Sequence, residues 1–374
     1  MPGVLTRSSI FRGTIASGID AYEVELYIYT GTQNTDRPAT ANYTLYVETV
    51  YDPVNDPLVK FTVEMSEYVN DFIESTYDGT WANSTTDAVW FDYRLRSFTP
   101  PSTYSSWSAF TNYQYEALSG YNYFEESLTA LPTAGYGAEI ATNKAVLIST
   151  GTTLYVPTGE TLTIPIFRPE LNTSYDVVYT DGTNNDFASG SYTLGATITE
   201  STGIIAYFTE DGTNPYTRIE QTHPTNPNSI INYIERVTEY KHTPIKIVFK
   251  NKFGALQEMW FFGKTILSTN TKSEGFNRAI TKSAVGVVDN SISGRVKYNK
   301  TGDERITLNS GFQVEANNEL FRQLMLSEQV WMHYDGNVVP VNVLDNQIQY
   351  KTSINDKLIN YTINFEFAFN KILK

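Results

Sequence analysis

The sequence has 374 residues and a formal net charge of −14, with 41% apolar, 18% charged and 14% aromatic residues. At about 150 residues per domain, this length favours two or three cores over one. No cysteine is present, which excludes disulfides, thiolate metal sites and a cysteine nucleophile. The abundance of Tyr, Thr, Asn and Ser predicts a mainly β protein, with two or three antiparallel β-sandwich modules and one or two short helices.

Charge divides the chain near residue 240. Through Tyr240 there are 29 acidic and 10 basic residues, and from Lys241 onward there are 12 acidic and 17 basic residues. Such a break indicates modules with different surroundings. Two interpretations stay open: the later module is kept soluble by lysine, or the acidic part of one copy faces the basic part of a neighbour. An acidic majority argues against duplex DNA as a partner, and no sequence readout of nucleic acid is expected.

Residues 1–143 are predicted to form an N-terminal β module. Ala21–Gly31 and Asn42–Asp52 both alternate apolar and polar residues, which is typical of two strands paired as a hairpin. Ser66 is the predicted N-cap of a short helix or helical turn. That helix is indicated by residues at helical spacing: Tyr68, Val69, Phe72 and Ile73.

Residues 102–143 close this module as a tyrosine-rich arm with weak periodicity. Stacked Tyr and Trp among polar neighbours suit a ligand-binding loop for sugar or protein. The competing interpretation, which we prefer, is a long arm packed on its own domain or on a neighbouring subunit.

A second module, residues 144–221, is predicted to be a small antiparallel sandwich, because short strands follow one another with turn signals between them. The turns at Asp181–Asn184 and Asp211–Asn214 share the sequence DGTN, which supplies positive φ in tight hairpins. Asp181 and Asp186 are a weak candidate calcium pair, although turn chemistry alone explains them. Residues 222–236 are predicted to be a linker.

The C-terminal module, residues 237–374, holds two strand signals, at Pro244–Gly254 and Gln257–Phe262, and one predicted helix, at Glu315–Ser327. A long final strand follows, either central in a sandwich or paired across a subunit boundary. Its predicted buried face is formed by Ile359, Tyr361, Ile363, Phe365, Phe367 and Phe369.

Catalytic signatures were sought and none was found. The three histidines (His223, His242 and His333) are not part of a zinc-binding sequence motif. The sequence also contains no nucleophile elbow, Walker A motif or GxGxxG loop. Glu125 and Glu126 would point to opposite faces of a strand, so they cannot flank one glycosidic bond. We therefore expect a protein that is not an enzyme and that has no cofactor. We also expect no membrane span, since no run of about 18 apolar residues occurs, and no secretory signal at the N-terminus.

Parts of the last third resemble tail or neck structural proteins of tailed phages infecting Bacteroidetes. IKIVFKNKFGALQEMWFF resembles their strand, Asn-x-Phe-Gly turn and aromatic strand, and ERITLNSGFQVEANNELFRQLMLSEQVWM resembles the strand, turn, helix and strand that follow. VPVNVLDNQIQYKTSINDKLINYTINFEFAFN resembles their closing strands, and VEMSEYVNDFIES near Met65 is similar to a further segment.

This resemblance implies a structural virion protein of the tail, baseplate or neck, assembled in the host cytoplasm. We expect a homo-oligomeric ring that docks neighbouring virion proteins. The alternative is a carbohydrate-binding or receptor-binding adhesion protein of the same particle. The candidate interface residues are Trp107, Tyr113, Tyr121, Tyr123, Trp260 and Phe262.

Overall fold

A computed structural model describes most of the chain. The described residues are 3–8, 11–16, 21–32, 35–48, 50–52, 56–81, 86–99, 103–109, 115–123, 125, 146–167, 176–180, 192–193, 205–209, 217–223, 226–238, 240–280, 286, 288, 290–350 and 359–370.

The chain forms two compact units, and neither unit is one continuous segment. Unit 1 comprises Met1–Thr238, Val248–Met259 and Ala316–Ser327, and unit 2 comprises Glu239–Ile247, Trp260–Glu315 and Glu328–Lys374. The predicted mainly β fold with several antiparallel sheets is confirmed. The partition into units differs from three consecutive modules, because two short segments of the C-terminal third belong to unit 1.

The first sheet of unit 1 has the strand order β1-β9-β7-β3-β4, and β8 pairs with β7. Its strands are β1 (Gly3–Leu5), β3 (Ala21–Tyr29), β4 (Tyr43–Glu48), β7 (Ala88–Thr99), β8 (Thr103–Tyr104) and β9 (Tyr115–Leu118). The predicted hairpin is confirmed, since β3 and β4 pair antiparallel with Leu26 opposite Tyr43. Val24 and Leu26 are fully buried, while the alternate residues Glu23 and Glu25 lie on the other face.

Helix α1 (Ser66–Asn70) packs its Val69 into the core beneath this sheet. The predicted N-cap at Ser66 is wrong by one residue: Met65 occupies the cap, and its side chain makes no capping hydrogen bond. The Ser66 N–H instead donates to the Glu64 carboxylate at 2.7 Å. A separate three-stranded sheet, in the order β2-β6-β5, contains β2 (Phe11–Ala16), β5 (Val50–Asp52) and β6 (Asp56–Glu64).

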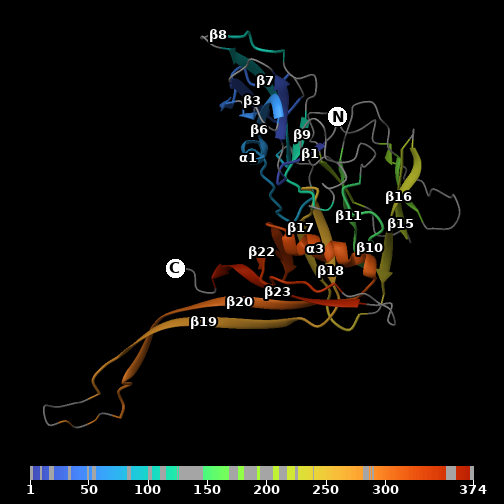
Figure 1. Ribbon diagram of the computed structural model, residues 1–374. Coiled ribbons are helices and arrows are strands. Elements are labelled where there is room, and N and C mark those ends of the chain that lie inside the picture. The colour runs from blue at the N-terminus through green and yellow to red at the C-terminus, as the bar shows by residue number, and fades with distance from the viewer. Residues whose placement is uncertain are drawn as a thin grey trace. The chain divides into compact units, whose positions relative to one another are not determined.

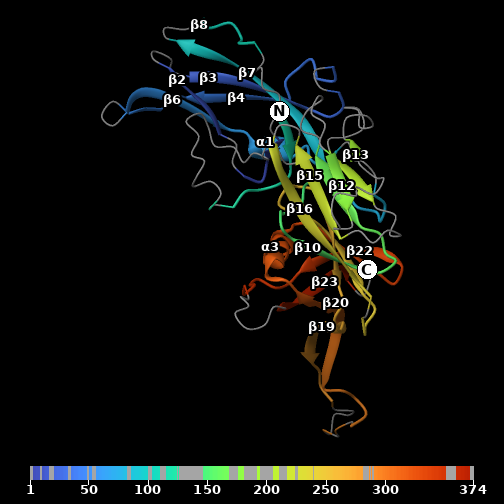
Figure 2. The same cartoon turned by 90° about the vertical axis from the view of Figure 1, so that its right-hand side faces the viewer.

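Two more sheets lie in unit 1. One has the order β10-β16-β15-β12-β13, and Figure 2 shows β12, β15 and β16 side by side. Its strands are β10 (Thr153–Pro157), β12 (Asp176–Thr180), β13 (Tyr192–Thr193), β15 (Arg218–His223) and β16 (Asn226–Val237). The other sheet pairs β11 (Thr163–Phe167) with β14 (Ile205–Thr209).

The predicted linker, 222–236, is wrong where the structure describes it: residues 222–223 belong to β15 and residues 226–236 belong to β16. β16 pairs antiparallel with β15 and parallel with β10, so its backbone groups bond on both sides. The Pro-rich composition of Thr222–Ser229 misled the prediction, because His223 and Asn226 already pair as residues of β15 and β16. The two DGTN turns lie outside the described residues.

Helix α3 (Asn318–Leu326) follows the 3-10 turn η2 (Glu315–Asn317), which confirms the helix predicted at 315–327. Leu320, Phe321 and Leu324 form its buried stripe, as their spacing predicted. The helix belongs to unit 1, whereas the strands that precede and follow it belong to unit 2.

The seven-stranded sheet has the order β18-β17-β21-β22-β23-β20-β19. Its strands are β17 (Ile245–Lys250), β18 (Leu256–Phe261), β19 (Ile266–Asn277), β20 (Arg295–Gln313), β21 (Val330–Tyr334), β22 (Asn337–Val343) and β23 (Ile359–Asn370). β23 lies between β22 and β20, so it is an interior strand. Its alternating apolar residues are buried as far as Phe365, but Phe369 is 58% exposed, so the buried face ends before it.

Strands β19 and β20 continue well past the other strands of their sheet (Figure 1). β23 pairs with β20 no further than Asp303 opposite Asn370. Beyond that point residues 271–277 pair only with residues 295–302. We call residues 271–277 and 295–301 the distal ribbon.

Candidate interaction surfaces

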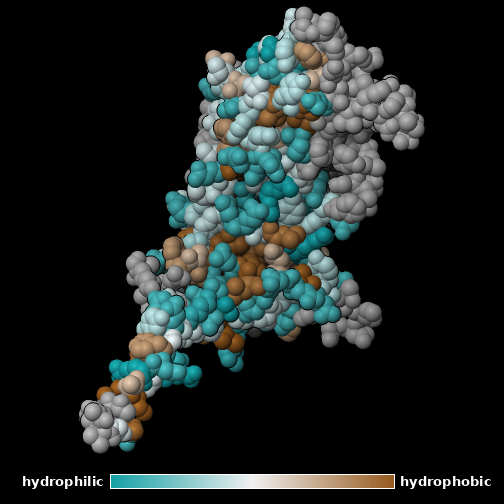
Figure 3. All heavy atoms as spheres, turned by 60° about the vertical axis from the view of Figure 1, so that its left-hand side comes forward, coloured by the Kyte–Doolittle hydropathy of each residue, from teal (hydrophilic) through white to brown (hydrophobic). Residues whose placement is uncertain are grey.

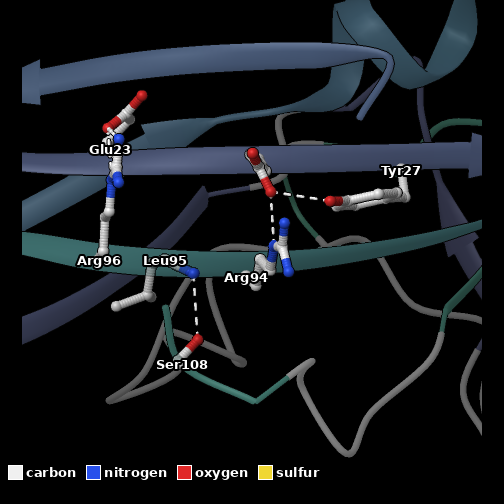
Figure 4. A network of polar contacts seen from close by, with 7 residues as sticks. Glu23, Tyr27, Arg94, Leu95, Arg96 and Ser108 are labelled. Carbon is white, nitrogen blue, oxygen red and sulfur yellow. Dashed lines mark hydrogen bonds and ion pairs between the residues drawn. The ribbon is translucent and has the colours of Figure 1, made fainter. Parts of the chain in front are cut away.

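A ladder of charged pairs covers the outer face of β3 and β7 (Figure 4). In the strand register Glu23 lies opposite Arg96 and Glu25 lies opposite Arg94. Arg96 Nε donates to Glu23 at 2.6 Å, and Glu25 accepts hydrogen bonds from Arg94 Nε and, at 2.7 Å, from the Tyr27 hydroxyl.

The charge of Glu25 is stabilised by this ladder. Burial alone would raise the pKa of Glu25, but hydrogen bonds from Arg94 and Tyr27 and the positive charges of Arg94 and Arg96 lower that pKa below its ordinary value. The carboxylates and guanidiniums on this face therefore neutralise one another.

The described part of the tyrosine-rich arm lies along its own sheet. The N–H groups of Ser105 and Ser108 donate to the carbonyls of Ser97 and Leu95 at 2.9 and 2.8 Å. In return, the two serine hydroxyls accept from the N–H groups of Ser97 and Leu95 at 2.9 and 3.1 Å. Residues 103–109 thus cover part of the edge of β7.

Trp107 caps the charge ladder. The guanidinium carbons of Arg96 and Arg94 lie 4.4 and 5.0 Å from the centroids of its ring system, and Arg96 also lies 4.5 Å from the Tyr104 ring. Cation–π contacts of this kind hold an exposed segment in place. Trp107 remains partly exposed, but a stacked sugar would compete with Arg94 and Arg96 for its ring.

Tyr121 and Tyr123 hold α3 within unit 1. Their rings meet edge to face at 5.6 Å, and the Tyr123 hydroxyl donates to Glu319 of α3 at 2.8 Å. Arg322, also on α3, lies 3.5 Å from the centroid of the Tyr123 ring, and Lys252 lies 4.8 Å from it. Each tyrosine is only 9% exposed, so a partner subunit can reach little of either ring.

The same cluster shifts both phenols toward their neutral forms. Burial raises the pKa of Tyr121 to about 12, and burial together with Tyr121 and Glu319 raises the pKa of Tyr123 further. Both hydroxyls therefore keep their protons at any physiological pH, and the Tyr123 hydroxyl donates to Glu319.

Trp260 and Phe262 lie in unit 2 at the end of β18. Trp260 is 8% exposed, and the Lys246 ammonium lies 5.6 Å from its ring. Phe262 is partly exposed and lies 6.4 Å from Tyr240, which is itself 44% exposed. Of these two interface candidates, only Phe262 offers ring surface to a partner.

The remaining candidates fall outside the described residues: Tyr113, Asp181 and Asp186. Among the residues that the structure describes, no group of three or more His, Asp or Glu side chains is placed to hold a metal ion. No helix in the same part of the chain combines the length and apolar character needed to cross a membrane.

The distal ribbon is the surface that the sequence analysis missed. All of β19 is exposed, and in the ribbon Phe276 and Tyr298 meet edge to face at 5.8 Å while each stays 49% exposed. Figure 3 shows brown apolar side chains alternating with teal polar ones along this projection. The available signal was the alternation of Val296 and Tyr298 with Arg295 and Lys297, which indicates a strand with one apolar and one basic face.

Comparison with known proteins adds no identification: no family model, no curated protein and no solved structure matches this chain.

Proposed function

We propose that this protein is a non-enzymatic structural component of a tailed phage virion, in the tail, baseplate or neck, which forms a homo-oligomeric ring and docks neighbouring virion proteins. The distal ribbon is the observation that carries the proposal. The resemblance of the C-terminal third to such proteins supports the choice of particle.

An exposed two-stranded ribbon is a poor folding unit by itself. Two strands in water are marginally stable, since neither face is covered and each ordered residue costs conformational entropy. At about 3.3 Å per residue, seven residues extend roughly 23 Å beyond the last pairing with β23. Exposed apolar side chains on such a projection indicate an interaction surface, and burial against another protein is the interaction that we expect.

Two buried carboxylates, Asp92 and Asp87, take part in structural contacts, which supports a non-enzymatic role. Asp92 accepts hydrogen bonds from Arg37 at 2.6 Å and from the Tyr29 hydroxyl at 3.1 Å, and burial raises its pKa despite the Arg37 charge. Asp87 accepts from the hydroxyl of Tyr207 at 3.2 Å. These contacts fasten the loop that carries Arg37 and join Asp87 to β14.

Mass spectrometry of purified virions, with copy number per particle, tests the proposal. We expect the protein in every particle at a fixed number that matches rotational symmetry, as a closed ring requires. A particle proteome that lacks the chain would refute the virion assignment.

The adhesin alternative predicts a different result. A purified adhesin should bind host surface glycan and lose that affinity in Trp107→Ala. A ring component should bind no glycan, and Trp107→Ala should only loosen residues 103–109 from β7. Tyr121→Ala is a poor probe for this purpose, because Tyr121 is buried and its loss would disturb α3.

A further inference from the structure

Two basic residues of the distal ribbon, Arg295 and Lys297, share one of its faces. In the strand register Phe276 is opposite Val296 and Glu274 is opposite Tyr298, so these residues share a face. Lys297 and Arg295 project from the other face, where their partners are the small or polar residues Gly275 and Asn277.

These basic side chains have no carboxylate partner among the described residues. Arg295 and Lys297 are exposed, and neither forms an ion pair within the described chain, whereas Lys272 at the base of the ribbon pairs with Asp303 at 3.0 Å. One face of the ribbon therefore carries Phe276, Val296 and Tyr298 together with Glu274, and the other carries positive charge that no ion pair within the described residues neutralises.

Unit 1 carries a surface of complementary character around α1. We call residues 66–80 the acidic segment; it contains four acidic residues and no lysine or arginine. Its four acidic side chains are exposed: Glu67, Asp71, Glu74 and Asp78. Residues between them that point inward, among them Val69 and Tyr77, are buried.

The acidic segment also offers an aromatic contact. Phe72 is 38% exposed and meets the edge of Tyr43 at 6.1 Å. None of the four carboxylates forms an ion pair within the described residues, so their charge too is available to a partner. The two surfaces match in charge: within the described residues, the ribbon carries basic groups without an ion pair, and the acidic segment carries acidic groups without one.

We propose that the distal ribbon of one copy docks on the acidic segment of a second copy, with Arg295 and Lys297 against Asp71 and Glu74. The inference rests on the proposed homo-oligomer and names its contact. Because the two surfaces differ, the contact is head-to-tail, which is the type of interface that closes into a ring when the rotation allows. Complementary charge sets the register of such a contact and speeds its formation.

Nucleic acid is a weaker choice of partner for the ribbon. The chain has a net charge of −14, and the ribbon offers only a few cations beside an apolar face, whereas phosphate recognition uses many cations along one track. Binding of duplex DNA by the ribbon would overturn the inference.

A charge exchange tests the contact in the full-length chain. The ribbon variant is Arg295→Glu/Lys297→Glu, and the segment variant is Asp71→Lys/Glu74→Lys. All four residues are exposed, so we expect both variants to fold with unchanged melting temperatures. In sedimentation velocity, each variant alone should self-associate at least about tenfold more weakly than the unaltered chain.

An equal mixture of the two variants should assemble again. In an alternating assembly each altered ribbon meets an altered segment of opposite charge, and each unaltered ribbon meets an unaltered segment. The control variant Lys241→Glu/Lys264→Glu makes the same charge change at exposed residues outside the ribbon and should associate like the unaltered chain.

Each outcome decides the inference. Unimpaired association of both variants, or no recovery in the mixture, would refute the ribbon contact while leaving a ring held by other surfaces intact. An unaltered chain that stays monomeric also refutes the contact, whereas absence from virions refutes the proposed function separately. Ribbon-dependent binding of duplex DNA without self-association would assign the ribbon to a different partner.

Discussion

Asn317 pairs with the backbone of Thr153 although the two residues are 164 positions apart in the chain. The Thr153 N–H donates to Asn317 Oδ1 at 2.8 Å, and Asn317 Nδ2 donates to the Thr153 carbonyl at 2.8 Å. A side-chain amide thus takes the place of a neighbouring strand residue and fixes the start of α3 to β10. Because this amide is engaged, Asn317 occupies the N-cap of α3 without making a capping bond.

Replacing Asn317 with Ala should lower the free energy of unfolding by about 2–4 kcal/mol, because two buried backbone groups of Thr153 lose their partners. Chemical denaturation of the full chain measures the change. Asn346→Ala, at an exposed asparagine, is the matched control and should stay within about 0.5 kcal/mol of the unaltered chain. Equal stability of the two variants would show that the pairing contributes nothing.

The Asn-x-Phe-Gly turn between β17 and β18 requires glycine at residue 254. Its φ is +80°, and a Cβ there would lie 2.8 Å from the Ser119 backbone. Asn251 Oδ1 accepts hydrogen bonds from Phe253 and Ala255 at 3.0 and 3.2 Å, so the turn has little freedom to move away.

Gly254→Ala should therefore destabilise the protein by more than the roughly 1 kcal/mol that a positive φ alone costs an alanine. Gly151 separates the two effects, because its φ is also +80° and an added Cβ would meet nothing within 4 Å. We expect Gly151→Ala to show only the conformational cost. If both variants melt at the same temperature, the close approach of the turn to Ser119 is not the reason for Gly254.

The helices and strands of this fold can be predicted from the sequence better than their division between the two units. Alternation in β3 and β4 and the stripe of Leu320, Phe321 and Leu324 follow from local periodicity, and both predictions are confirmed. The membership of α3 in unit 1 depends instead on single polar side chains: Asn317 bonds Thr153, and Gln323 Nε2 donates to Ser149 at 2.6 Å. Such long-range pairs leave no periodic trace in the sequence.

The candidate surfaces illustrate the same limit. Aromatic composition pointed to Tyr121 and Tyr123 as interface residues, but composition cannot tell a ring that packs a helix from a ring that awaits a partner. The distal ribbon was not predicted from the sequence, because most of its residues are polar. Both of its faces are exposed because the pairing of β20 with β23 ends at Asp303, and this end point cannot be seen in the ribbon residues themselves.

His333 should make stability fall in mild acid. Burial, together with the nearby positive charge of Lys246, lowers the pKa of His333 from 6.5 to about 4. The unfolded chain therefore binds more protons between these two values, so the contribution of neutral His333 is complete above about pH 6.5 and is lost as the pH falls toward 4. The loss should be on the order of 1–3 kcal/mol, since the side chain is only half-buried.

Denaturation of the unaltered chain and His333→Gln at several pH values checks this expectation. The difference in unfolding free energy between the two proteins should change between about pH 4 and pH 6.5 and should be constant above pH 6.5. Lys246→Met removes the repulsion, raises the pKa of His333 and should make the decline smaller. A difference that is constant from pH 7 to 4 would contradict the lowered pKa.

Removal of the distal ribbon should abolish self-association without unfolding the rest of the chain. Lys272 and Thr301 are paired residues of β19 and β20, so a two-residue Asn-Gly turn can join them in place of residues 273–300. The sheet proximal to this point keeps its pairing with β23, and we expect its melting temperature to change little. Sedimentation velocity should find a monomer where the unaltered chain associates.

Replacing a single side chain of the distal ribbon should also weaken self-association while leaving folding unchanged. Phe276 is 49% exposed, so Phe276→Ser should leave the melting temperature of the monomer nearly unchanged. If the ribbon buries this ring against another copy, the substitution should weaken self-association by about tenfold or more, since a fully buried Phe is worth about 1.5–3 kcal/mol. Tyr350→Ser, at an equally exposed aromatic residue of unit 2 outside the ribbon, should associate normally. Weakening of the same size in both variants would mean that general surface hydrophobicity, and not the ribbon, drives assembly.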